Sequence, residues 1–424
     1  MPVNELHLRL ERNKLYIRPP LASPADTEFS VEIEASPGEL QLLRCMRECL
    51  CSANPQHPSS DGWFEFFGRR LAARLHADAT RYLPSDGTSP LRVFLQTTLP
   101  NDLDGQTLRE APWELLRFSA GLGTEAVLGT SPRLTVTRLL SVDASLARPG
   151  PVFQRKLRVL FIDASTPETA DLGGDKVRSL IDDQIEGEVV RWTGQDLRTC
   201  WDQVRYPRKQ STSHTQSEFD VIHILGHGKQ VNGQVEVVVD DEGTMSAVQI
   251  AEALAGRCRI AVLQSCSTAG AAPELLSRGP EAVVAMLYDI DRDHSTAFIT
   301  RLYSGLANGD AIDVAVQQGR NHLDPAGRKS CVGAPVLYAR TTQPVAFLGS
   351  SLDGPAVTAA GSPSQTPPPP GRDDVDALSR TARPAPPRTR RTSGPAAPDD
   401  APIARPRGGQ ATSLLGVRAN REEV

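Results

Sequence analysis

Residues 219–228 read FDVIHILGHG, an apolar run that stops abruptly at His227 between Gly226 and Gly228. A second apolar run, RIAVLQSCSTAG at residues 259–270, stops in the same way at Cys266 among small residues. In an open parallel sheet, the side chains at the carboxyl ends of the strands meet in one crevice. A thiol and an imidazole brought together there form a nucleophile and its base. The two runs therefore predict a cysteine hydrolase built on an α/β sheet.

The chain between about residues 155 and 348 alternates strand-like and helix-like stretches. Its strand-like stretches are near-continuous apolar runs, which are typical of a parallel sheet covered on both faces. The sequence therefore predicts a mostly parallel six-stranded sheet with helices on both faces. The expected strands are 157–164, 188–193, 219–225, 259–265, 282–287 and 335–340, and the expected helices are 174–186, 195–205, 246–256, 271–279, 294–307 and 309–322. We also expect an inserted hairpin at 235–239 and beyond the turn at 240–243, because Asp and Gly favour tight turns.

Residues 1–150 are expected to form a mixed α/β region that precedes this core. Alternating apolar residues predict strands at 6–17 and 29–35, and further strands are expected at 91–97 and 134–140. Helices are expected at 39–50 and 63–82, and a short one begins at Pro112, because proline suits the first turn of a helix. A Pro/Gly break at 148–151 marks a boundary. We therefore divide the chain into 1–150, 151–348 and 349–424.

The last part of the chain has a different composition. Residues 351–424 contain no aromatic residue and no cysteine, and they include a proline run at 367–370 and an Arg/Pro segment at 380–391. Such a segment cannot bury enough apolar surface to offset its ordering entropy, so we expect it to be disordered. The short apolar stretch at 413–418 is interpreted as part of a solvated tail, with a docking motif as the alternative.

Composition narrows the function classes. The net charge of -5 argues against nucleic acid as the main partner, and the aromatic content of 5% argues against a carbohydrate-binding or base-stacking surface. The 7 cysteines form neither a CxxC pair nor a disulfide framework, so we expect no metal and no cofactor. The N-terminus lacks the apolar core of a signal peptide, and no stretch approaches the roughly 18 apolar residues of a membrane span. We therefore expect a cytoplasmic protein with reduced thiols.

The glycines on either side of His227 have a physical purpose. Glycine allows a sharp turn off a strand and lets the backbone approach a substrate closely. The backbone N–H groups of Gly228 and Cys266 could then face a developing oxyanion. His223, four residues before His227, would lie on the same face of a continuous strand, and we interpret it as a packing residue.

Several sequence blocks, in order, resemble those of the CHAT family (caspase-HetF-associated-with-TPRs) of caspase-like peptidases. The block APWELL at 111–116 resembles the upstream PWELL block of that family, and HILGHG at 223–228 resembles its H-x-x-G-H-G motif. The block LQSCSTA at 263–269 resembles the segment that carries the family's cysteine. The following strand at 282–291 is similar too, with Tyr288 in place of a tryptophan, and so is the strand that begins at Pro335. The similarity spans roughly residues 60–348.

This resemblance implies a caspase-like cysteine endopeptidase with His227 and Cys266 as its catalytic residues. His227 would act mainly as the acid that protonates the leaving amine, and Cys266 would lose its proton to solvent or to His227. The substrate would be a partner protein, encoded nearby, in a bacterial defence or signalling system. The Q-A-C-[RQG]-G signature of animal caspases is not met, because serine occupies positions 265 and 267. No TPR-like repeat is visible in the sequence.

Two other interpretations remain open at this point. The first is a catalytically silent caspase-like scaffold or regulatory binding module. The second is a different cysteine hydrolase or an acyl transferase on a flavodoxin-like sheet. A nucleotide-binding switch is disfavoured, because the glycines at 173–174 follow no P-loop spacing and lack its lysine.

Three acids, Asp289, Asp291 and Asp293, follow the strand after the cysteine strand. They could line a specificity pocket that favours Arg or Lys before the cleaved bond, through charge complementarity. The alternative for Asp291 is an N-cap of the helix that follows, because Asp is a common capping residue. With basic specificity, the Arg-rich tail would itself be a candidate for self-cleavage.

Overall fold

The computed structural model describes residues 4–11, 14–19, 29–32, 68–69, 72, 83, 90–97, 109–119, 125–131, 133–140, 157–164, 179, 185–191, 219–231, 234–239, 243–323, 329–342 and 345–346. All of them belong to one compact unit, Met1–Ala356. The helices expected at 39–50 and 195–205, most of those expected at 63–82 and 174–186, and the tail expected to be disordered lie outside the described residues. At the end of the helix expected at 174–186, Glu186 belongs to a strand instead.

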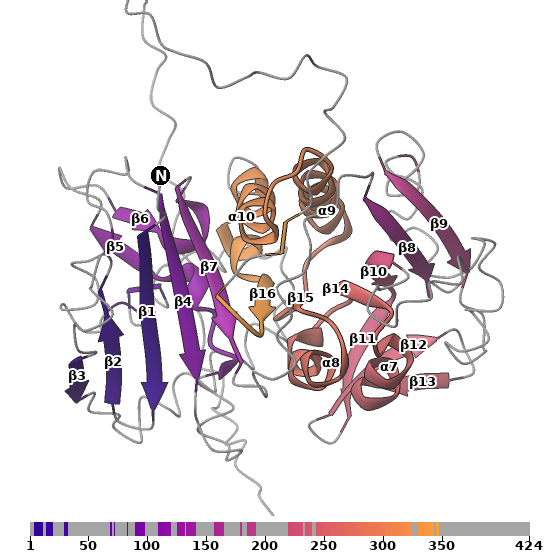
Figure 1. The fold of residues 1–424 in the computed structure, drawn as a ribbon, viewed down its shortest axis with the longest axis horizontal. Helices are drawn as coiled ribbons and strands as arrows, with labels where there is room; N and C mark the ends of the chain where they lie inside the picture. Colours follow the sequence, from indigo (N-terminus) through magenta and orange to yellow (C-terminus); the bar gives the residue numbers. More distant parts are fainter. Residues whose placement is uncertain are drawn as a thin grey trace, which may run out of the picture. The chain divides into compact units, whose positions relative to one another are not determined.

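The six strands expected from the apolar runs form consecutive strands of one sheet (Figure 1), in the order β16-β15-β14-β10-β8-β9. Their bounds are β8 Arg158–Asp163, β9 Glu186–Arg191, β10 Phe219–Leu225, β14 Cys258–Gln264, β15 Ala282–Met286 and β16 Pro335–Ala339. All neighbouring pairs are parallel except β15 and β16, which run antiparallel. Every residue of β10 and β14 is buried, which explains why both strands read as continuous apolar runs. The predicted mostly parallel arrangement of these six strands is confirmed, but the sheet to which they belong is larger than the six strands expected.

The N-terminal strands extend this same sheet to eleven strands. β7 (Leu134–Leu139) pairs in parallel with β16, and β4 (Leu91–Thr97) lies beyond it. β1 (Asn4–Glu11), β2 (Lys14–Arg18) and β3 (Phe29–Glu32) complete the far edge. The sequence pattern predicts the mixed α/β character of this region but not its continuity with the core sheet. The division at residue 150 stays a prediction.

Two smaller sheets accompany the main one. The expected hairpin is present as β12 (Gln234–Val239) and β13 (Gly243–Ser246), with β11 (His227–Val231) as a third antiparallel strand. β5 (Arg117–Ser119) pairs with β6 (Glu125–Val127). Between and beside these strands lie two short 3₁₀ helices, η1 (Trp113–Leu115) and η2 (Leu128–Thr130). The short helix expected at Pro112 is thus a single 3₁₀ turn.

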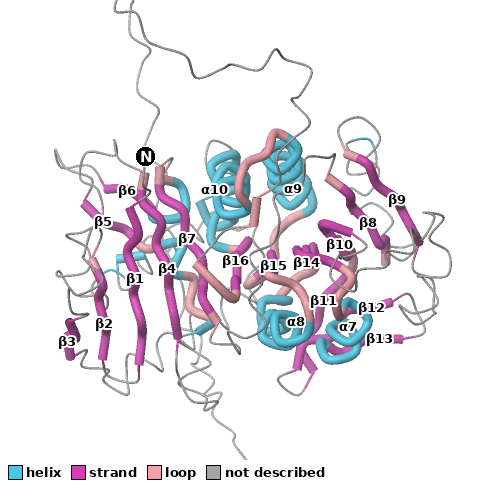
Figure 2. The backbone as a smooth tube through the Cα atoms, in the orientation of Figure 1, coloured by secondary structure: helices cyan, strands magenta, loops and turns pink. Residues whose placement is uncertain are grey.

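Helices cover both faces of the sheet, as expected. Figures 1 and 2 show α9 (Arg292–Ala307) and α10 (Ile312–Leu323) on one side of β14–β16, and α7 (Ala247–Leu254) and α8 (Ala272–Arg278) on the other. The chain begins α7 with a capping box between Ser246 and Gln249, and it begins α9 with the carboxylate of Asp291 as N-cap. Two more 3₁₀ helices are η5 (Thr268–Ala271) and η7 (Lys329–Gly333). None of the described helices is long and apolar enough to cross a membrane.

A buried charged cluster joins the N-terminal strands to the core. The guanidinium of Arg138 on β7 donates to the Glu114 carboxylate (Nε to Oε1, 3.1 Å) and to the carbonyl oxygens of Arg109 and Ala111. Arg320 on α10 lies 3.5 Å from the same carboxylate and donates to the carbonyl of Pro335 at the start of β16. Glu114 and Arg320 are fully buried. The Glu114 carboxylate is therefore the shared anionic partner of Arg138 on β7 and of Arg320 on α10.

We expect the substitution Arg138→Met to lower the free energy of unfolding by about 3–5 kcal/mol, because it leaves the Glu114 carboxylate buried beside fewer donors. The milder Glu114→Gln should also destabilise the protein. The matched control is Arg278→Met, which removes an arginine from an exposed ion pair with Glu252. That change should cost less than about 1 kcal/mol. Urea denaturation measures all three, and equal effects of Arg138→Met and Arg278→Met would contradict the prediction.

Candidate active site

His227 and Cys266 lie at the same level on neighbouring strands. β10 and β14 are parallel, and Leu225 is the partner of Gln264 at the end of their register. Each candidate residue follows its strand end by two positions, and the backbone N–H of Gly226 donates to the Gln264 carbonyl (3.4 Å) across the strand ends. Both residues are partly buried. The two residues that the sequence singled out therefore lie just beyond adjacent strand ends, at the carboxyl edge of the sheet.

The backbone at Gly228 packs directly against the backbone of Cys266. A Cβ atom added at Gly228 would overlap the carbonyl oxygen of Cys266 and would lie 3.0 Å from a methyl group of Thr268. At Gly226 the same atom would lie 3.2 Å from a side-chain carbon of Ala164 and 3.4 Å from one of Val237, and the nearest backbone atom, the Val238 carbonyl oxygen, would be 3.6 Å away. The requirement for glycine is thus strict after His227 and weaker before it.

The turn that carries Cys266 is tightly fixed. Ser267 adopts a left-handed conformation (φ 54°), the one described non-glycine residue with a positive φ. Such a conformation is strained for most side chains and persists where surrounding contacts impose it. Those contacts include Thr268, whose hydroxyl donates to the carbonyl of Ser265 (2.8 Å) and accepts from the backbone N–H of Met286 on β15 (3.2 Å). The hydroxyl thereby ties the turn to the next strand.

The thiol of Cys266 is protonated in this arrangement. Burial raises its pKa to about 12, and the neighbouring Asp289 carboxylate raises it as well, because a negative charge opposes a thiolate. A backbone hydrogen bond from Ile290 acts in the opposite direction but is outweighed. The hydroxyl of Ser267 also reaches Asp289 (3.4 Å). Burial, reinforced by the Asp289 carboxylate, therefore favours the neutral form of the thiol.

The two histidines of the motif have different environments. Nε2 of His227 is buried and has no hydrogen-bond partner among the described residues, so it is not engaged with Cys266 at rest. His223 is fully buried, with its ring edge against Phe161 and Nδ1 lying 3.1 Å from the Tyr303 hydroxyl. Burial lowers the pKa of His223 to about 3, so it stays neutral near pH 7. This confirms His223 as a packing residue. The same-face rule does not extend to His227, because β10 ends at Leu225.

The three acids after β15 are separated by the structure. Asp289 faces Cys266, as described above. Asp291 is the N-cap of α9, accepting from the backbone N–H of His294 (3.1 Å), so the capping alternative is confirmed. The side chain of Asp293 is 77% exposed and lies 3.7 Å from Arg292. Of the three, Asp289 is the carboxylate beside the thiol.

Comparison with known protein families agrees with this geometry. The family model of the CHAT domain matches residues 69–331, which is more than half of the chain. This chain belongs to the CHAT-domain family. No curated protein matches the sequence.

Solved structures similar to this CHAT-domain protein are distant in sequence. One is the Saccharomyces cerevisiae separase–securin complex, at 15% identity and a TM-score of 0.39, covering 77% of this chain. The match spans only 21% of the separase-complex chain, about a fifth of its length. Another is the Arg-specific cysteine proteinase gingipain R, at 10% identity and a TM-score of 0.41, covering 65% of this chain and 72% of the other. The pro- and mature domains of Porphyromonas gingivalis RgpB match at 10% identity and a TM-score of 0.40, covering 66% and 75% of the two chains. The α/β fold that the sequence predicts, a mostly parallel sheet with helices on both faces, is the fold that the structure shows.

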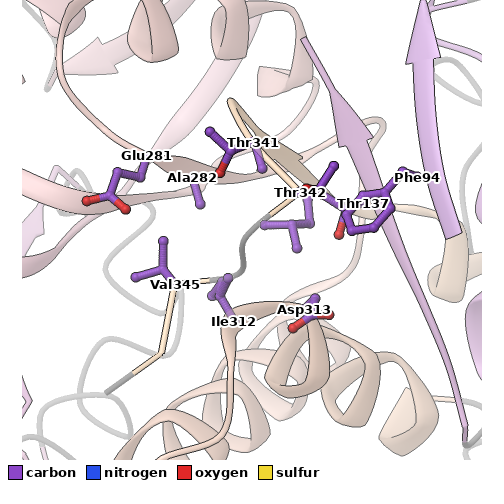
Figure 3. Close-up of a pocket in the computed structure, with 11 residues that line it drawn as sticks. Phe94, Thr137, Glu281, Ala282, Ile312, Asp313, Thr341, Thr342 and Val345 are labelled. Atoms are coloured by element: carbon purple, nitrogen blue, oxygen red, sulfur yellow. The ribbon is translucent and has the colours of Figure 1, made fainter. Parts of the chain in front are cut away.

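A small pocket lies away from the candidate residues. Side chains from β4, β7, β15, β16 and α10 line it (Figure 3). Ala282, at the start of β15, is one of its lining residues. Cys266 follows the end of the parallel neighbour β14, so it lies at the opposite edge of the sheet. Asp313 in this pocket is already bound to Arg92 (2.8 Å) and Thr135 (3.0 Å). The pocket is therefore no part of the candidate active site of the CHAT-domain protein.

The sequence did not predict which contacts hold the turn that carries Cys266, called here the nucleophile turn. Thr268 and Ser267 follow the cysteine directly, but no local pattern shows that one bonds β15 and that the other is left-handed. The local sequence alone could have assigned Asp291 as the N-cap of the following helix, because Asp is a common capping residue, and could thereby have distinguished it from Asp289.

We expect Gly228→Ala to destabilise the protein by about 1–3 kcal/mol, because the new methyl group meets backbone that cannot move aside. It should also displace Cys266 and reduce its reactivity. The matched control is Gly243→Ala on β13, where an added Cβ meets no atom within 4 Å. Thermal unfolding and Cys266 alkylation measure both variants. A Gly228→Ala protein indistinguishable from Gly243→Ala would refute the close approach.

We expect Asp289→Asn to lower the pKa of Cys266, because it removes the carboxylate that opposes the thiolate. At a fixed pH below about 12, alkylation by iodoacetamide should rise about tenfold for each unit by which the pKa falls. Asp293→Asn removes the same charge from an exposed position and serves as the control. Peptide mapping isolates the rate at Cys266 across pH. Equal profiles for both variants would show that Asp289 does not hold the thiol neutral.

Proposed function

We propose that this protein is a cysteine endopeptidase that hydrolyses peptide bonds in a partner protein. The observation that carries the proposal is the placement of His227 and Cys266 at one level of adjacent strand ends, with the backbone of Gly228 against that of Cys266. Nucleophilic catalysis requires a nucleophile and a proton-transfer group within reach of one another, and positions just beyond two adjacent strand ends can supply that arrangement. Membership of the CHAT-domain family supports the same chemistry.

The proposed reaction has two steps. The Cys266 thiol passes its proton to His227 or to solvent as its sulfur attacks the carbonyl carbon of the substrate, and the backbone N–H groups of Gly228 and Cys266 stabilise the oxyanion that forms. His227 donates a proton to the leaving amine as the C–N bond breaks, which yields an acyl-enzyme. Water then attacks the thioester, returns the thiol and releases the carboxylate product. The buried Nε2 of His227, which has no partner among the described residues, supports its availability to the leaving group.

Asp289 supports a preference for Arg or Lys before the cleaved bond. Its carboxylate lies beside Cys266, where the side chain of the residue before the cleaved bond must pass. A guanidinium pairing with Asp289 would form a charge-assisted hydrogen bond. It would also offset the negative charge that raises the thiol pKa, so a basic substrate would promote formation of the thiolate that attacks it. Asp291 is committed to its cap and Asp293 to the surface, so neither shares this position.

The substrate follows from the family resemblance together with this charge preference. A partner protein in a bacterial defence or signalling system is the proposed target. The Arg/Pro segment at 380–391 is a second candidate, because it offers basic residues in the same chain.

Peptide acyloxymethyl ketones with Arg, Leu or Asp at the reactive position test this function. We expect the Arg probe to label the wild-type protein, and labelling to disappear in both Cys266→Ala and His227→Ala. Glu252→Gln, at an exposed position on α7, is the control that should label normally. Mass spectrometry of the same incubations without probe shows whether the 380–391 segment is cut. An intact segment would remove self-cleavage while leaving the peptidase proposal in place.

A catalytically silent scaffold is the second candidate, and one observation favours it. The pKa of the Cys266 thiol is raised to about 12 and Nε2 of His227 has no hydrogen-bond partner among the described residues, which describes an unproductive site as well as a resting one. Absence of labelling by every probe, with and without candidate partners, would favour the scaffold. Labelling that survives His227→Ala would instead show a reactive cysteine without the proposed histidine.

A further inference from the structure

A second cluster of reactive side chains lies outside the proposed catalytic pair. Asp291 and His294 occupy the first turn of α9, and Cys331 reaches them from η7. One carboxylate oxygen, one ring nitrogen and the Cys331 sulfur all lie within 4.8 Å of one another. Within the described part of the chain, this is the one group of three such donors. No local sequence pattern predicts this cluster, because Cys331 belongs to a segment distant in sequence from Asp291 and His294.

We propose that Asp291, His294 and Cys331 form a binding site for a divalent cation of the zinc class. Thiolate, imidazole and carboxylate are the three protein ligand types that zinc takes, and three protein ligands leave a fourth position for water. A tetrahedral ion with bonds of about 2.0–2.3 Å separates its ligands by roughly 3.3–3.8 Å. The present spacing is close to that range, so side-chain adjustments of about 1 Å would close the site.

The His294 ring is already turned toward the Asp291 carboxylate. Its Nδ1 lies 2.7 Å from a carboxylate oxygen of Asp291, so two of the three proposed ligand atoms face one another. An ion at Nδ1 would take the place of this hydrogen bond. The side chains are sheltered, with 14% of His294 and 19% of Asp291 exposed. Cys331 is 2% exposed, which excludes it as a second nucleophile toward a protein substrate.

Charge balance is consistent with a doubly charged ion. On binding, the Cys331 thiol releases its proton, and the thiolate and the Asp291 carboxylate together neutralise the ion. The amino end of α9 disfavours a cation by about 0.3–1 kcal/mol. Two anionic ligands at bonding distance exceed that opposition, so the helix end lowers the affinity without preventing binding.

The site is joined to the segment that contacts the proposed nucleophile. Asp289 and Ile290, which act on the Cys266 thiol, immediately precede Asp291. η7 packs against η1, and a Cβ at Gly333 would lie 2.6 Å from the Tyr288 hydroxyl. A bound ion would therefore anchor residues 288–291 to η7 and fix the carboxylate beside the thiol. This consequence rests on the proposed peptidase function, whereas the metal site itself does not.

Titration with Co²⁺ tests the site without any measurement of activity. The full chain, reduced and stripped with a chelator, should show a thiolate-to-cobalt charge-transfer band, and Zn²⁺ should displace it. Cys331→Ser should abolish the band from this site, and His294→Gln should weaken Co²⁺ binding by at least about tenfold. The matched control is Cys258→Ser, which removes a cysteine that is equally buried but lies at the start of β14. Cys266→Ala should keep the band.

Two results would overturn the proposal. One is the absence of a charge-transfer band in the wild-type protein. The other is a band of unchanged intensity in Cys331→Ser and His294→Gln, which would assign the metal to other cysteines. If Cys331→Ser does not fold, the His294→Gln titration decides, because that side chain lies at the partly exposed rim. Probe labelling is measured separately, so a protein that binds cobalt but is never labelled would disprove the peptidase function alone.

Discussion

The buried carboxylate of Glu114 is the constraint on which the rest of the structure depends. It balances two arginines that come from opposite parts of the chain, Arg138 on β7 and Arg320 on α10. Burial lowers the pKa of Arg320 to about 10, so this guanidinium still carries its charge near pH 7 and requires a counter-charge. Removing Glu114 would leave two buried guanidiniums without their carboxylate, and removing either arginine would leave that carboxylate with fewer donors where water cannot reach it. The junction between β7 and β16 is therefore fixed by electrostatics as well as by strand pairing.

Contacts of Gly228 and Thr268 hold the turn that carries Cys266. Gly228 and Thr268 enclose the turn from β11 and from η5, and the Thr268 hydroxyl connects it to β15. These contacts hold Ser267 in a conformation that it would not adopt alone. The same segment after β15 supplies Asp289 to the thiol and Asp291 to the start of α9. Position and protonation of Cys266 are thus controlled from different strands.

Much of the fold and the central part of the site follow from sequence. Continuous apolar runs predicted β10 and β14, because those strands are buried on both faces. The rule for the carboxyl ends of parallel strands predicted that His227 and Cys266 would follow adjacent strand ends. Pairing between distant strands leaves no periodic signal, so the continuity of β7 with β16 was not foreseen. Glu114, Arg138 and Arg320 look like surface residues in a sequence, since charge is buried only where partners converge. The meeting of Cys331 with His294 depends on the same long-range packing.

The antiparallel strand β16 has a consequence for how this protein can be divided. It is the seam between β15 and β7, and its carbonyl at Pro335 receives Arg320. A fragment cut at the compositional break near residue 150 would contain both proposed catalytic residues, yet β16 would become an open edge able to pair with other chains. Arg320 would also lose its only carboxylate neighbour among those described. The smallest autonomous unit for expression or transplantation therefore includes β7 and the Trp113–Leu115 turn, both of which precede the Pro/Gly break near residue 150.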